Sequence, residues 1–173
     1  APEHWPWFGA FDWGFEHPWC FGLFTVNEDG QIYLADTFHG RRDTAPQIAQ
    51  KCREYMEAKD HIPVAPDQLI SVQAGHDTFA TQRSRGDDTP HRAEAMVGEG
   101  FPVVRANIDR VHGLNTLREY LSWQNRGPDD TPGDPALYIM DTPGNQRTFG
   151  CLESMTTDPD NPEDVLERDA DDF

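Results

Sequence analysis

Lysine is nearly absent from this sequence, which has only two, Lys51 and Lys59, among its 14 basic residues. The 31 acidic residues bring the formal net charge at pH 7 to -17. A chain with this charge does not bind nucleic acid by bulk electrostatic attraction. Any contact with DNA therefore needs a local arginine patch or metal ions.

The excess of Asp over Glu, together with the scarcity of Lys, also favours a high-salt source. In molar salt the Debye length falls to about 3 Å, which screens the repulsion between acidic side chains. We therefore hypothesise a halophilic origin. The free energy of unfolding should then rise with NaCl concentration, and complete folding in dilute buffer would contradict the hypothesis.

Several motifs of common enzyme classes are missing. No GxxxxGKS or GxxxxGKT run occurs, which excludes a P-loop within this sequence, and no HxxxH or HExxH spacing indicates a zinc hydrolase. Cys20, Cys52 and Cys151 form no CxxC pair, and we expect small buried thiols in a reducing compartment. No run approaches the roughly 20 apolar residues that span a bilayer, and we expect no signal peptide and no membrane partner.

The most informative run that is present is Phe11-Asp12-Trp13-Gly14. It places one aspartate between apolar residues that read as a buried strand, followed by a glycine turn. A carboxylate in that setting loses hydration unless a cation or hydrogen-bond donors meet it. A divalent metal ion is the usual partner, so Asp12 is the first candidate metal ligand.

The pattern of elements predicts an α/β fold. We expect strands at 7–15, 19–27, 31–39, 69–74, 101–106 and 136–140, and helices at 44–59, 91–100, 111–123 and 146–155. The first three strands form an antiparallel meander, and the later strands alternate with helices. This order gives a mixed sheet with helices on both faces, the architecture of the ribonuclease-H-like fold.

A second aspartate follows a strand in a similar way. Asp77 comes directly after the 69–74 strand, within Gly75-His76-Asp77. If that strand is the neighbour of the first, Asp12 and Asp77 converge at one edge of the sheet, where open sheets place their sites. Two such carboxylates repel each other unless cations lie between them, as in two-metal phosphodiester hydrolysis. The alternative is that Asp77 is a turn or cap residue.

The whole chain resembles the C-terminal nuclease domain of terminase large subunits from tailed phages and viruses. The resemblance lies in Phe11-Asp12-Trp13-Gly14 followed by Pro18, in the 33–36 strand, in the helix start at 45–49, in Gly75-His76-Asp77, and in 107–121 and 161–165. It implies that Asp12 and Asp77 are the first and second metal-binding acids. It also implies one ribonuclease-H-like nuclease domain over residues 1–173, with the packaging ATPase upstream and a C-terminal helix truncated.

The third acid of this family precedes a final helix. Asp172 is the best match and Asp171 the second choice, in the closing run Asp171-Asp172-Phe173. The resemblance thus implies two Mg²⁺ or Mn²⁺ ions held by Asp12, Asp77 and Asp172 or Asp171, all three acids being catalytic. Asp141, at another strand end, is a reserve candidate.

The implied activity is a metal-dependent endodeoxyribonuclease that cuts concatemeric viral DNA. Its implied partners are double-stranded viral DNA, the ATPase domain of the same polypeptide, the portal and the small terminase. The implied location is the host cell cytoplasm, transiently on the procapsid. Arg83 and Arg85 are candidates for phosphate contact, or else part of a solvated loop. Rival interpretations are a resolvase or RNA–DNA hybrid nuclease of the same fold, and a catalytically silent docking module.

Overall fold

Six strands form one mixed sheet in the computed structural model, which describes residues 1–80, 92–121, 134–156, 158–161 and 164. The strands are β1 (Trp7–Asp12), β2 (Trp19–Val26), β3 (Ile32–Gly40), β4 (Ser71–Ala74), β5 (Val103–Arg105) and β6 (Leu137–Ile139). Their order is β5-β4-β1-β2-β3-β6. The pairs β1–β2 and β2–β3 are antiparallel, which confirms the predicted meander. The pairs β1–β4, β4–β5 and β3–β6 are parallel.

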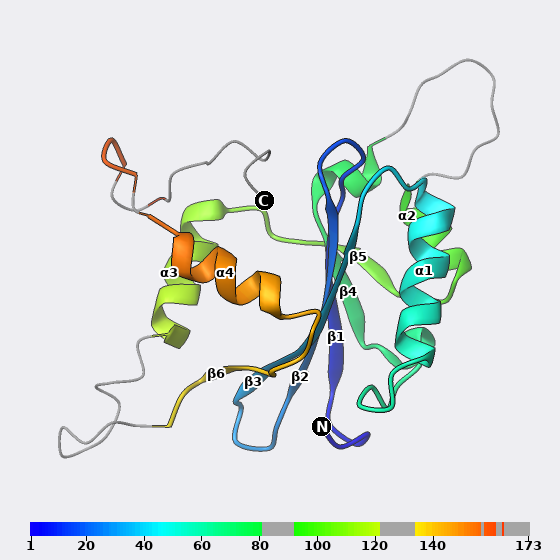
Figure 1. Ribbon diagram of the computed structural model, residues 1–173, viewed down its shortest axis with the longest axis horizontal. Coiled ribbons are helices and arrows are strands. Elements are labelled where there is room, and N and C mark those ends of the chain that lie inside the picture. Colours follow the sequence, from blue (N-terminus) through cyan, green and yellow to red (C-terminus); the bar gives the residue numbers. More distant parts are fainter. Residues whose placement is uncertain (81–91, 122–133, 157, 162–163, 165–173) are drawn as a thin grey trace.

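Helices cover both faces of this sheet, as predicted. They are α1 (Ala45–Glu57), α2 (Arg92–Gly98), α3 (Arg110–Leu121) and α4 (Gln146–Ser154), with short 3₁₀ turns η1 (Pro66–Gln68) and η2 (His76–Phe79). Figure 1 shows α1 and α2 on one side of the sheet and α3 and α4 on the other. We call these the inner and outer faces. No helix among the described residues is long and apolar enough to cross a membrane.

The inner face holds the hydrophobic core. Strand alternation turns Trp7 and Phe11 of β1 toward α1, and Phe21 of β2 lies at the centre, stacked 5.4 Å from the Phe38 ring. From α1 the buried residues are Ala45, Ile48, Ala49, Cys52 and Met56, at the predicted helical spacing. Burying one large apolar side chain contributes about 1.5–3 kcal/mol. By contrast, α3 and α4 contain no fully buried residue.

One element boundary differs from the prediction in a way that matters for the site. The apolar run 7–15 suggests a strand through residue 15, but β1 ends at Asp12. The next residues turn back toward β2, and Phe15 uses its carbonyl to accept a hydrogen bond from the Arg42 backbone N–H at 2.9 Å. Trp13 packs against the core while Phe15 is exposed, so the apolar run continues past the end of the strand, which local periodicity alone does not reveal.

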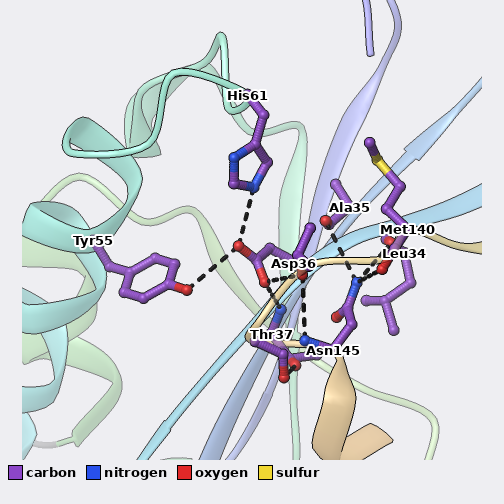
Figure 2. Close-up of polar contacts among 10 residues, drawn as sticks. Leu34, Ala35, Asp36, Thr37, Tyr55, His61, Met140 and Asn145 are labelled. Atoms are coloured by element: carbon purple, nitrogen blue, oxygen red, sulfur yellow. Dashed lines mark hydrogen bonds and ion pairs between the residues drawn. The ribbon is translucent and has the colours of Figure 1, made fainter. Parts of the chain in front are cut away.

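A buried carboxylate connects strand β3 to both helical layers. Asp36 is fully buried, and its oxygens contact the His61 ring nitrogen at 3.0 Å and accept a hydrogen bond from the Thr142 hydroxyl at 2.7 Å. Asn145 lies beside it and donates to the Met140 carbonyl at 2.8 Å. Figure 2 shows these contacts meeting between α1 and the connection from β6 to α4.

A second buried carboxylate anchors the start of α1. Asp43 accepts hydrogen bonds from the Trp19 indole at 2.9 Å and from the Lys51 ammonium at 2.6 Å. The hydrogen bond and charge of Lys51 lower the pKa of Asp43, and the bond from Trp19 lowers it further against the opposing effect of burial. Asp43 thus stabilises the fold in its ionised form.

Replacing Asp43 by Asn should therefore destabilise the protein in a pH-dependent way. The folded-state pKa lies below the unfolded value, so the stabilisation is present above about pH 4 and is lost as pH falls through the folded pKa. We expect Asp43→Asn to cost about 1 kcal/mol at pH 7, a modest value because Lys51 is half exposed. Urea denaturation from pH 7 to pH 3 measures this. Asp60→Asn, at an exposed position, is the control; a cost that persists undiminished at pH 3 would contradict the assignment.

Candidate functional site

The first candidate acid, Asp12, is the last residue of β1. It is paired across the sheet with Cys20, the second residue of β2. Because side chains alternate along a strand, Phe11 enters the inner core while Asp12 points to the outer face. The carboxylate is therefore held by a strand whose neighbouring residues are locked in the core.

The second candidate acid is brought to the same edge by parallel pairing. Phe11 of β1 lies opposite Ala74 of β4, and the Gly75 N–H donates to the Phe11 carbonyl at 3.4 Å. Asp77 follows in η2, directly beyond this last contact. The strands are neighbours, so Asp12 and Asp77 lie together at the carboxyl ends of β1 and β4.

The Asp12 carboxylate has few described partners that stabilise its charged form. Burial raises its pKa, the charge of Asp77 raises it further, and the backbone N–H of Trp13 opposes both. Within the described ranges no Lys or Arg lies at ion-pair distance from Asp12. Because the pKa of Asp12 is raised in the folded chain, ionisation of this carboxyl lowers the stability of the fold. A bound cation would remove that cost.

Arg92 joins the two acid-bearing segments, and sequence reasoning missed it. Its guanidinium lies over the Trp13 ring, 4.1 Å from the centroid, and donates to the Asp77 backbone carbonyl at 2.8 Å. It reaches across from α2, fifteen residues after Asp77. His76, flagged as a neighbour of Asp77, contacts that carboxylate at 3.0 Å, with both side chains largely exposed.

The turn after Asp12 explains the glycine of the run. A Cβ built on Gly14 would overlap the backbone carbonyls of His17 and Pro18. Backbone cannot yield as a flexible side chain does, so only glycine lets the chain fold back this closely. This turn sets where β1 ends and β2 begins, and so where Asp12 stands.

The reserve candidate Asp141 and two further acids, Glu16 and Asp109, have partners of their own away from Asp12. Asp141 follows β6, which pairs only with the first residues of β3, and it accepts a hydrogen bond from Gln146 at 2.6 Å. The carboxylate of Glu16 faces Arg42 at 3.6 Å on the surface. Asp109 caps the first turn of α3 by accepting from the His112 N–H at 3.0 Å.

The remaining candidates, Asp171, Asp172, Arg83 and Arg85, lie outside the described residues. Among the residues that the structure does describe, no group of three or more His, Cys, Asp or Glu side chains is placed to hold a metal ion. The described part of the site is therefore a pair of acids. Carboxylate oxygens are the ligands that Mg²⁺ and Mn²⁺ prefer, so the donor chemistry of the pair fits the expected ions.

A groove that no sequence pattern predicted opens on the outer face beside Asp12. It has a volume of about 380 Å³, and we call it the α4 groove. Its walls come from the 17–20 segment, from β3 and from α4, and its lining includes Asp12, Cys20, His39, Arg147 and Cys151. The cysteine expectation is right for Cys52, which is buried in the core, and wrong for Cys20, which is exposed.

Comparison with known proteins gives a structural match only. No protein-family model matches the sequence, and no curated protein sequence matches it. The large terminase of a thermophilic bacteriophage superimposes with a TM-score of 0.66 at 14% identity, over 99% of this chain and 38% of that chain. The P22 large terminase nuclease domain gives a TM-score of 0.63 at 16% identity, over 99% of this chain and 77% of that one. The phage large terminase in complex with ADP matches with a TM-score of 0.64 at 15% identity, over 97% and 37% of the two chains.

These matches confirm the predicted fold class. The chain is an α/β protein with a ribonuclease-H-like mixed sheet, strand order β3-β2-β1-β4-β5 extended by β6 at the β3 edge. Within that class it has the fold of the terminase nuclease domain. It spans 38% of the length of the phage large terminase that it matches.

Backbone atoms lie so close to Gly14 that adding a single methyl group there should strongly lower the free energy of unfolding. Gly14→Ala should lower the free energy of unfolding by about 2 kcal/mol, because the added Cβ meets rigid backbone. Gly150→Ala is the matched control, since its Cβ would meet no described atom within 4 Å in the interior of α4. It should raise stability by about 0.5 kcal/mol through helix propensity. Urea denaturation of both variants measures the contrast, and equal effects would refute the proposed turn constraint.

Proposed function

We propose that this chain is the nuclease domain of a large terminase, a metal-dependent endodeoxyribonuclease that cuts concatemeric viral DNA during genome packaging. The observation that carries the proposal is the pair Asp12 and Asp77 at adjoining strand ends of a terminase nuclease fold. Neither the fold nor the acid pair alone would suffice, because folds host many functions and acidic chains have many aspartates.

In this proposal Asp12 and Asp77 hold divalent ions, with Asp172 or Asp171 as the third acid. The raised pKa of Asp12 supports it, because burial and the charge of Asp77 both disfavour the ionised carboxylate, and a bound cation would offset both effects. When bound, two Mg²⁺ or Mn²⁺ ions supply Lewis-acid activation of water and neutralise charge at the scissile phosphate.

The chain's own residues fix the geometry. Asp12 is held by its strand and by the Gly14 turn, and Asp77 by the Arg92 contact to its backbone. Positioning of this kind matters because small displacements of catalytic groups cost large factors in rate. Contacts to DNA are expected mainly at the backbone, so the cut should have little sequence specificity.

The wider setting follows from the matched proteins. The phage large terminase was solved with ADP and with ATP-gamma-S, which supports a packaging ATPase domain in the same polypeptide as this nuclease. Double-stranded viral DNA, the portal and the small terminase are the proposed partners. The proposed location is the host cytoplasm, transiently on the procapsid.

Plasmid nicking tests the activity. With Mn²⁺, the wild-type chain should convert supercoiled DNA to the nicked form, and EDTA should stop it. Asp12→Asn and Asp77→Asn should each lower the rate at least about a hundredfold, because each removes a charged metal ligand. Asp29→Asn, in the exposed turn between β2 and β3, is the matched control and should leave the rate unchanged.

Substrate choice separates the rival functions. A terminase nuclease should cut linear duplex DNA, whereas a resolvase should prefer a four-way junction and a hybrid nuclease an RNA–DNA duplex. If the wild type cuts none of these at any salt concentration, the chain is a docking module and the nuclease proposal fails. Full activity in Asp12→Asn would refute the assigned site.

A further inference from the structure

The α4 groove has Asp12 on one wall and the positively charged side chain of Arg147 on another. Asp12 and Cys20 lie opposite each other on β1 and β2, and both line the groove. Arg147, from the first turn of α4, lines it as well. On the inner side, Phe11 and Trp19 are buried in the core. Any strand of DNA that reaches Asp12 must therefore approach over the outer face, where the groove lies.

Arg147 has no acidic partner among the described residues, and neither do Lys59, Arg92 and Arg105, which instead lie over the rings of Tyr55, Trp13 and Phe79. Lys51 pairs with Asp43 and Arg110 with Asp164. Arg42 and Arg53 likewise have glutamate partners. In a chain of net charge -17, an arginine that lines a groove with neither a described carboxylate nor a described ring against it is suited to an anionic ligand.

The charge of Arg147 acts inside the groove. Desolvation and the charge of Asp12 raise the pKa of the Cys20 thiol, and the charge of Arg147 opposes them. Burial lowers the pKa of His39, and Arg147 lowers it further, so His39 is neutral at pH 7 and offers a hydrogen bond without charge. Among the described residues, Arg147 is the only Lys or Arg in the groove lining.

We propose that the α4 groove holds a DNA backbone phosphate next to the one that is cut, bound chiefly by Arg147 with His39 beside it. The guanidinium fork matches phosphate oxygens in two parallel hydrogen bonds, and weak hydration of the group favours such contacts. Phosphate contacts set the register of DNA on a protein. The inference rests on the proposed nuclease function and adds the path of the strand, from Asp12 along the groove toward α4.

DNA binding without metal tests the phosphate subsite separately from cutting. The full chain is titrated in EDTA with a short fluorescein-labelled duplex, and anisotropy gives Kd at several salt concentrations. Arg147→Gln should weaken binding about fivefold at low salt and reduce the slope of log K against log salt by about 0.9, the value for one phosphate contact. Arg147→Lys should keep the slope but recover only part of the affinity.

Arg118→Gln is the matched control, because it makes the same charge change on α3, outside the groove lining. Equal losses in the two glutamine variants would assign the effect to net charge and overturn the subsite. So would an unchanged salt slope in Arg147→Gln, or no DNA binding by the wild type at low salt. Thermal melts that match the wild type exclude misfolding of the variants.

Nicking then distinguishes the two proposals. If the wild type cuts, Arg147→Gln should raise KM with little change in kcat, since the phosphate it holds is not the one cut. A wild type that binds through Arg147 but never cuts supports the subsite and refutes the nuclease. A wild type that cuts while Arg147→Gln matches it in Kd, salt slope and KM refutes the subsite alone.

Discussion

The buried carboxylate of Asp36 constrains the connection from β6 to α4, and through it the position of α4 on the outer face of the sheet. A charge taken out of water must be met by donors, and Asp36 meets His61 after α1, Thr142 before α4 and the N–H of Thr37 on its own strand. Gly144 packs so closely against Asp36 that any side chain there would overlap it. This network fixes where α4 starts, and the start of α4 carries Arg147 into the groove beside Asp12.

Asp36 and Asp12 are two aspartates on neighbouring parts of one sheet with opposite surroundings. Asp36 is fully buried and has four described partners, so its charge is satisfied within the protein (Figure 2). Asp12 is partly buried, has a like charge nearby and has no described cation at ion-pair distance. Folding tolerates the cost of Asp12 because its neighbours in the chain, Phe11 and Trp13, pack in and against the hydrophobic core. Such stored repulsion is typical of sites that bind an ion.

Much of the fold could be predicted from the sequence because its signals are local. Strand alternation, the 3.6-residue spacing of α1 and the Thr44–Pro46 helix start each act over a few residues, and they placed every helix and strand within a few positions. Asp12 and Asp77 were predicted as a pair because one ends a strand and the other follows a later strand closely, and the structure places the two strands side by side. Arg92 and Arg147 were missed because their contacts depend on how α2 and α4 pack, which no local pattern encodes. The metal-binding roles of Asp12, Asp77, Asp171 and Asp172 stay predictions, as do the DNA contacts of Arg83 and Arg85.

The acidic surface and the proposed chemistry make opposite demands. A net charge of -17 concentrates divalent cations near the protein and repels DNA, both over a distance set by the ionic strength. For a site with two carboxylates, the raised local concentration of divalent cations favours metal binding, whereas the repulsion disfavours DNA binding. Filling Asp12 and Asp77 with cations would reverse the local sign, and Arg147 extends that positive region along the groove. In such a chain metal binding would create the catalytic centre and strengthen the contact with DNA that Arg147 makes, so the loss of one metal ligand should abolish cutting and weaken DNA binding.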